Sequence, residues 1–141
     1  MERSSEQVCE SAVTDLTGAF VFVVEDEPIV ALDLRVTLEE AGATVIGPAL
    51  TLRQAEALSS EQRISVALLD VRLGNGDVFN VAAKLWDRGV PLVFHTGHGT
   101  DEALLSRWPG SKVLAKPARA HLILSTLAGL VRKASPKVQP A

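Results

Sequence analysis

Short apolar runs alternate along this chain with longer stretches of helical periodicity, and this alternation limits the possible folds more than any other feature. Strand-like runs occupy residues 19–24, 44–46, 66–69, 92–94 and 113–115. Each is followed by apolar residues at helical spacing, over residues 27–41, 52–58, 78–86, 100–107 and 118–133. Strands that alternate with helices predict a doubly wound α/β domain, in which a five-stranded parallel sheet has helices on both faces.

Local signals agree with these boundaries. Pro28 suits the first turn of the first helix, and Gly42 suits its C-terminal cap. The pair Gly47–Pro48 is expected to end the second strand, and Thr51 to cap the helix after it. The third run, residues 66–69, is apolar at successive positions, which is typical of a strand covered on both faces.

Composition and charge exclude several classes of function. The 141 residues suit one domain, and 47% apolar with 22% charged residues is typical of a globular protein. A net charge of −3 without a Lys/Arg cluster argues against nucleic-acid binding. No apolar run approaches the roughly 20 residues of a membrane span, and there is no signal-peptide pattern. We expect a flexible arm over residues 1–18, a disordered tail over 134–141 and, with Cys9 as the single cysteine, a cytoplasmic protein.

Charged and hydroxyl side chains stand at the ends of four of the strand-like runs. Glu25 and Asp26 follow the first, Asp70 follows the third, Thr96 follows the fourth and Lys116 follows the fifth. Because the carboxyl ends of parallel strands meet at one edge of a doubly wound sheet, we expect these five residues to converge there.

The residue types predict what such a cluster does. Three carboxylates offer the hard oxygen ligands that Mg²⁺ prefers. One of them, Asp70, could attack phosphorus as a nucleophile and form an aspartyl phosphate. Lys116 would neutralise charge on Asp70 or on the arriving phosphoryl group, and Thr96 offers a hydroxyl to the new phosphoryl oxygens.

At these residues the sequence resembles the receiver domain of two-component response regulators, over residues 19–133. The resemblance implies a flavodoxin-like (βα)5 fold with strand order 2-1-3-4-5 and a sensor histidine kinase that phosphorylates Asp70. It also implies Mg²⁺ bound by Glu25, Asp26, Asp70 and the backbone carbonyl of Arg72, with Thr96 as the switch hydroxyl and Lys116–Pro117 closing the motif. Such a protein is not an enzyme beyond its own phosphorylation and dephosphorylation.

The sequence departs from the usual receiver pattern at the switch. Val113 stands where receivers commonly carry an aromatic residue. The segment Phe94–His98 is similar to the Phe-x-Thr-Gly-Tyr motif of a receiver subgroup associated with HWE-type and related kinases, with His98 in place of the tyrosine. We expect His98 to take over part of the switching, and Arg72 and His98 to tune the lifetime of the phosphoryl group. We interpret His95 as a solvated or structural loop residue rather than a metal ligand.

The expected role is that of a stand-alone receiver, or of a receiver cut from a larger chain, because nothing after residue 133 has the length of an output domain. It would act through protein contacts, as a relay member, a phosphate sink or a docking partner. The last helix is apolar over more than one face, which favours either a partner, including a second copy, or a broad core-facing stripe.

Two other functions use similar residues. A Mg²⁺-dependent aspartyl-phosphate phosphohydrolase normally carries a second acid two residues after the nucleophile, where this chain has Arg72. A mononucleotide-binding flavodoxin-like protein would need a glycine fingerprint of which only Gly74 and Gly76 are present.

Overall fold

The computed structural model describes residues 13–74, 76–97 and 101–134. The main elements follow the predicted alternation, with one short hairpin between β3 and α4. In chain order they are β1 (Phe20–Val24), α2 (Pro28–Glu40), β2 (Thr44–Ala49), α3 (Leu52–Leu58), β3 (Val66–Leu69), β4 (Arg72–Leu73), β5 (Gly76–Asp77), α4 (Phe79–Asp87), β6 (Leu92–Thr96), α5 (Asp101–Arg107), β7 (Lys112–Ala115) and α6 (Ala120–Ala134).

The five main strands form one parallel sheet in the order β2-β1-β3-β6-β7. This confirms the predicted order 2-1-3-4-5 once the small hairpin of β4 and β5 is set aside. Because all five strands run the same way, their carboxyl ends lie at one edge of the sheet. β1 and β3 are central, and they are the strands that lead into Glu25 and Asp70.

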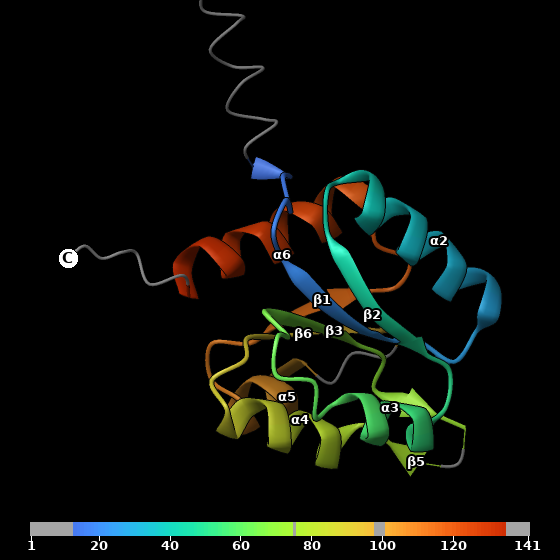
Figure 1. The fold of residues 1–141 in the computed structure, drawn as a ribbon. Coiled ribbons are helices and arrows are strands. Elements are labelled where there is room, and N and C mark those ends of the chain that lie inside the picture. Colours follow the sequence, from blue (N-terminus) through green and yellow to red (C-terminus); the bar gives the residue numbers. More distant parts are fainter. Residues whose placement is uncertain (1–12, 75, 98–100, 135–141) are drawn as a thin grey trace, which may run out of the picture.

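Helices cover both faces of the sheet (Figure 1). The helices α2 and α6 lie on one face, and α3, α4 and α5 lie on the other. Alternate strand residues therefore enter two separate cores: Phe22 and Leu69 pack under α3 to α5, whereas Val23 and Leu68 pack under α2 and α6. All four residues of β3 are buried, as the unbroken apolar run predicted.

Both ends of α2 carry the residues that the sequence analysis predicted there. Pro28 opens the helix, where its missing N–H has no partner to lose, and Gly42 follows Ala41 with φ +100°. The turn that follows leads directly into β2.

The second strand is longer than predicted. β2 continues through Gly47 and Pro48 to Ala49, where an irregularity in its register with β1 accommodates the pair. β2 is an edge strand, which is where a sheet tolerates proline. Gly47 has φ +102°, and a Cβ there would lie 2.8 Å from the carbonyl oxygen of Val23, so only glycine fits.

The packed part of the chain begins before residue 19, so the expected N-terminal arm is too long. Leu16 is 1% exposed in the core under α2 and α6, and its N–H donates to the carbonyl of Ala41 at 2.8 Å. Leu16 is a single apolar residue among polar neighbours, so hydrophobic periodicity gives no signal that it is buried. At the other end, Ala134 belongs to α6 rather than to the predicted tail, and residues 135–141 lie outside the described residues.

The apolar surplus of α6 goes largely into the domain. Ile123, Leu127, Ala128 and Leu130 are buried, and Leu124 and Val131 pack at the edge of the same core. Leu122, 48% exposed, is the large apolar side chain that α6 presents to solvent. The broad core-facing stripe therefore accounts for most of the pattern.

The helix α3 has the predicted N-terminal cap. The Thr51 hydroxyl accepts a hydrogen bond from the Gln54 N–H at 3.1 Å, and the Gln54 side chain accepts from the Leu50 N–H at 2.7 Å. We expect Thr51→Ala to lower the free energy of unfolding by about 1 kcal/mol. Urea denaturation measures this, and Thr51→Ser, which keeps the hydroxyl, should lose much less. Equal losses in both variants would contradict a role for the cap.

None of the helices in the described part of the chain combines the length and apolar character needed to span a bilayer.

Candidate metal and phosphoacceptor site

The sheet holds the strand-end residues in place by continuing its hydrogen bonds past the strands. The Asp70 N–H donates to the Val24 carbonyl at 2.9 Å, and the Lys116 N–H donates to the Thr96 carbonyl at 2.8 Å. The Glu25 N–H likewise donates to Ala49 at 2.9 Å. The backbone on which each functional side chain stands is therefore fixed before any ligand arrives, as the convergence argument predicted.

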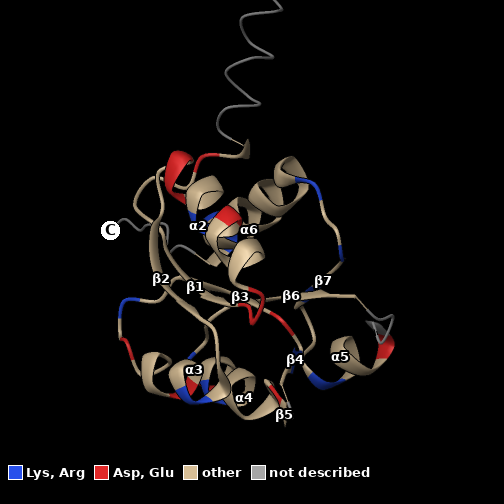
Figure 2. Cartoon of the chain, turned by 90° about the vertical axis from the view of Figure 1, so that its right-hand side faces the viewer, with Lys and Arg blue, Asp and Glu red and all other residues tan. Residues whose placement is uncertain are grey.

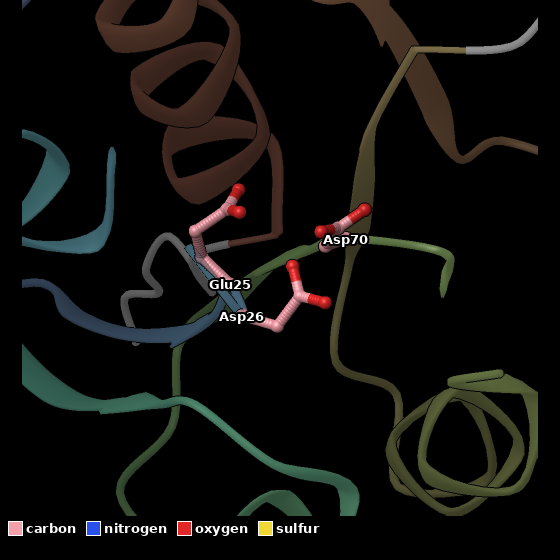
Figure 3. Close-up of side chains that lie close together, drawn as sticks. All are labelled: Glu25, Asp26 and Asp70. Carbon is pink, nitrogen blue, oxygen red and sulfur yellow. The ribbon is translucent and has the colours of Figure 1, made fainter. Parts of the chain in front are cut away.

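The three acids gather at the carboxyl ends of β1 and β3 (Figure 3). One carboxylate oxygen from each of Glu25, Asp26 and Asp70 lies within 4.8 Å of the others. Glu25 and Asp70 are buried and Asp26 is half-buried. Carboxylates that lie this close together and are shielded from water repel one another unless a cation lies between them.

The Lys116 ammonium supplies one positive charge to this cluster. Its Nζ lies 2.9 Å from Glu25 Oε1 and 3.3 Å from Asp70 Oδ2. Burial alone would lower the pKa of Lys116, but its contacts with Glu25 and Asp70 outweigh burial and raise it, so the ammonium stays charged. One ammonium against three carboxylates leaves the site negative.

Burial raises the pKa of the Asp70 carboxyl from 3.8 to about 6, and the charge of Glu25 adds to the effect while Lys116 opposes it. The residue is only 7% exposed, which agrees with burial as the main cause. The charged form of Asp70 is therefore disfavoured when no metal is bound.

Backbone N–H groups position the other two acids. The Glu27 N–H donates to Glu25 Oε2 at 3.2 Å, and the Gly74 N–H donates to Asp26 Oδ2 at 3.3 Å. The second contact joins the β4–β5 hairpin to the acidic cluster, and the sequence analysis missed it. Gly74 has φ +57°, a left-handed conformation that favours glycine, and its place in the sequence gives no signal of a contact with Asp26.

The cluster fits a divalent cation. Glu25 Oε1 is buried and accepts no well-directed hydrogen bond from any described residue, although Lys116 lies at ion-pair distance. An all-oxygen donor set with a buried, under-satisfied carboxylate matches the ligand preference of Mg²⁺, which keeps several waters of its own. Glu25, Asp26 and Asp70 are the residues that would hold it.

For the other predicted site residues the structure gives a location, while their roles stay predictions. Thr96 is buried at the end of β6 beside Ala115, next to the acidic edge. Val113 pairs with Phe94 and is half-buried at the margin of the core under α3 to α5. Arg72 opens β4 with an exposed side chain. His98 lies outside the described residues, so the expectation of a switching role stays a prediction.

The interpretation of His95 as a loop residue is wrong. It belongs to β6, pairs with Leu114 and is 5% exposed. Burial and the nearby Lys116 charge lower the pKa of its imidazole, so it is neutral. The strand continues past Phe94 because β7 is long enough to pair with it through Thr96.

This fold and this acidic edge agree with comparisons to known proteins. Residues 21–128 match the response regulator receiver domain family, and the chain belongs to that family. A curated relative is the phyllosphere-induced regulator PhyR of Methylorubrum extorquens, 32% identical over 102 residues. The match covers 69% of this chain but 38% of that relative, so the chain spans well under half of it.

Solved structures lead to the same fold. A response regulator receiver protein from Sinorhizobium medicae is 27% identical with a TM-score of 0.72, over 83% of this chain and 97% of that one. PhyR from Brucella abortus has a TM-score of 0.76 at 22% identity, over 90% of this chain and 53% of that one. At that lower identity the second similarity shows the fold alone.

Proposed function

We propose that the protein receives a phosphoryl group on Asp70 from a sensor histidine kinase, with Mg²⁺ held by Glu25, Asp26, Asp70 and the backbone carbonyl of Arg72. The observation that carries this proposal is the cluster of three acids with the Lys116 ammonium among them, at the carboxyl edge of a receiver sheet. The phosphorylated domain then signals through protein contacts, as a relay member, a phosphate sink or a docking partner.

The chemical step needs little from the protein beyond position and charge. An Asp70 carboxylate oxygen forms a bond to phosphorus while the bond from phosphorus to the donor breaks, and the donor leaves with the electron pair. With a phosphohistidine donor whose other ring nitrogen carries a proton, the leaving group is a neutral imidazole, and with acetyl phosphate it is acetate. Mg²⁺, when bound, neutralises charge on the phosphoryl oxygens.

The side chains of the chain itself prepare that step. Burial keeps water away from Asp70, and its pKa of about 6 leaves it largely ionised at neutral pH. Lys116 contacts Asp70 before the reaction and is close enough to follow the charge onto a phosphoryl oxygen. Thr96, fixed through its carbonyl to the Lys116 N–H, is the proposed hydroxyl that senses the product.

The readout is proposed to differ from that of receivers with an aromatic switch residue. The half-buried Val113 has no hydroxyl and no ring to swing. The proposed route therefore runs through Thr96 and the segment after it, where His98 takes part in switching, and the side chain of Arg72 beside the site tunes the lifetime of the phosphoryl group.

A surface beside the site supports contact with a phosphodonor protein. Ile29, Leu32 and Val36 are exposed on α2, at 84%, 61% and 44%. A cavity of about 510 Å³ lies between the start of α2 and the β7–α6 connection, with Ile29, Lys116 and Pro117 in its lining. A kinase helix that docks here brings its phosphohistidine to Asp70. An HWE-type or related kinase is the proposed class, on the resemblance of Phe94–His98.

Incubation with Mg²⁺ and acetyl phosphate, followed by intact mass, tests the proposal. The wild type should gain the mass of one phosphoryl group, base-labile and stable to mild acid, because an acyl phosphate has that chemistry. Asp70→Asn should gain none, and Asp33→Asn, an exposed acid on α2, should react like the wild type.

Three results would contradict the proposal. They are an adduct that persists in Asp70→Asn, an adduct that forms equally well in EDTA, or turnover of an added phosphomonoester. The last would favour the phosphohydrolase instead.

A further inference from the structure

A cleft lies between the β4–β5 hairpin and α5, and its side chains are neither metal ligands nor part of the docking surface on α2. Of these side chains, only Arg72 has a part in the proposed function, as the residue that tunes the lifetime of the phosphoryl group. The cleft has a volume of about 480 Å³. Figure 2 shows α5 beside β4 and β5 on the same side of the sheet. Its lining comes from the hairpin, from the first residue of α4 and from α5: Val71, Arg72, Gly74, Gly76, Asp77, Phe79, Ala103, Leu104 and Arg107.

The guanidinium of Arg107 is held in a fixed position at one wall of the cleft. Its carbon lies 4.8 Å from the centre of the Phe79 ring and 4.7 Å from the centre of the Trp108 ring. The centres of the Phe79 and Trp108 rings are 5.5 Å apart. The Trp108 ring also packs against the buried Phe94, with 5.4 Å between the ring centres. The rings lie beside an exposed guanidinium without accepting a charged hydrogen bond from it, so its N–H donors are available to a ligand.

A second guanidinium contributes to the lining. Arg72 is exposed on β4, and neither Arg72 nor Arg107 takes part in an ion pair with the side chains that the structure describes, which are those of residues 13–74, 76–97 and 102–134. The carboxylate of Asp77 is partly committed, since its Oδ1 accepts a hydrogen bond from the Phe79 N–H at 3.0 Å. The lining therefore carries two guanidiniums against one partly committed carboxylate, which favours a negatively charged ligand.

We propose that this cleft binds an acidic peptide segment of a partner protein, in which one carboxylate lies between Arg72 and Arg107 and a neighbouring apolar side chain packs on Val71, Phe79 and Leu104. Guanidinium groups bind carboxylates through paired, charge-assisted hydrogen bonds. The apolar lining between them adds nothing to a free anion, but it stabilises the side chain next to the acid in a peptide.

The cleft lies next to the acidic cluster, so a peptide bound there could affect the metal and phosphoacceptor site. Val71 directly follows Asp70, and Gly74 holds Asp26 through its N–H. A peptide in the cleft therefore touches the same hairpin that completes the acidic cluster. Binding itself does not depend on the proposed phosphorylation, so each can fail without the other.

The test uses ¹⁵N NMR titration with the blocked peptide acetyl-Leu-Asp-Leu-Asp-Leu amide. Backbone shifts should map to residues 71–79 and 103–108 and should saturate. The matched peptide with asparagine for each aspartate should bind at least about tenfold more weakly, the size of one lost charged hydrogen bond. Arg72→Gln and Arg107→Gln should each weaken the acidic peptide by about the same factor, while Arg53→Gln on α3 should not.

The two arginines are tested differently because Arg107 also packs on rings. Arg72 is exposed, so its variant keeps the fold. Arg107→Lys keeps the charge but loses the planar fork, and it should still weaken the peptide. Equal affinity for the asparagine peptide, no effect of either arginine, shifts that map elsewhere, or sodium acetate binding as tightly as the peptide would each overturn the proposal.

Discussion

Replacing Lys116 by methionine should lower the free energy of unfolding by about 2–4 kcal/mol at pH 7.5 in EDTA. Breaking a buried ion pair by removing one partner costs about 3–5 kcal/mol, and the partial exposure of this ammonium reduces that figure. Its partner Glu25 has a side chain only 1% exposed, and Asp70 lies against the same Nζ. Methionine keeps the apolar stem of lysine, so the loss isolates the charge.

Two features of this loss identify its cause. It should shrink as the pH falls toward 5, because carboxylates without a counter-charge take up protons more readily in the folded state than in the unfolded chain. Mg²⁺ should also restore more stability to the variant than to the wild type, since the cation then meets three unpaired acids.

Urea denaturation at several pH values, with and without Mg²⁺, measures both effects of Lys116→Met. Lys112→Met is the matched control, because Lys112 is exposed on β7, the strand that leads to Lys116, and has no ion pair with any described side chain. An equal loss in the control, or a loss that neither pH nor Mg²⁺ alters, would show that packing rather than charge is responsible.

Most of the sheet could be predicted because its strands carry a strong and simple signal. Residues 66–69 are apolar at every position and are buried at every position, so run length alone located β3. Residue types at the turns located α2 and α3, since Pro28 and Thr51 have specific roles at helix starts. Alternation of strands and helices then predicted a parallel sheet with helices on both faces, and the strand order came from the resemblance to receiver domains.

The parts that were missed depend on contacts between distant segments. The hairpin of β4 and β5 contains only two residues in each strand, too few to show any period. Leu16 is one apolar residue in a polar segment, and it is buried because it lies under the turn after α2. His95 is polar, but the pairing of β6 with β7 extends past it, which the isolated run of residues 92–94 does not reveal.

The site could be predicted at the level of backbone position but only in part at the level of side-chain pairing. Parallel strands bring Glu25, Asp70 and Lys116 to one edge whatever their rotamers. The sequence analysis paired Lys116 with Asp70 or with an arriving phosphoryl group. The structure confirms the contact with Asp70, at 3.3 Å, and adds a shorter contact with Glu25, at 2.9 Å, that the sequence analysis did not predict.

Replacing Asp70 by asparagine should make the metal-free protein more stable at pH 7.5, by about 1–3 kcal/mol. The carboxyl has its pKa raised from 3.8 to about 6 in the folded state, mainly by burial, and that difference corresponds to about 3 kcal/mol. Asparagine is similar in size and carries no charge to bury. The gain is less than the full figure because Lys116 loses one of its two partners.

The stability difference between the wild type and Asp70→Asn should depend on pH. Because the folded state holds the Asp70 proton more tightly than the unfolded chain, the wild type loses stability as the pH rises from about 4 through about 6. Asp70→Asn lacks this loss, so the two proteins should be nearly equal in stability near pH 4 and should diverge up to about pH 7. Urea denaturation in EDTA at intervals of pH measures the difference, with Asp33→Asn expected to run parallel to the wild type.

Mg²⁺ should reverse the order of the two proteins. A cation that binds only the folded state adds RT ln(1 + [Mg²⁺]/Kd) to stability, and the wild type offers it three carboxylates where the variant offers two. The wild type should therefore gain at a few millimolar Mg²⁺, and Asp70→Asn should gain little. If the profiles stay parallel in EDTA, burial does not raise the pKa of Asp70. If Mg²⁺ stabilises both proteins equally, Asp70 is not among its ligands. A buried acid that destabilises the empty site is the arrangement expected of a residue kept for its chemistry, since the bound cation or phosphoryl transfer offsets the cost of its charge.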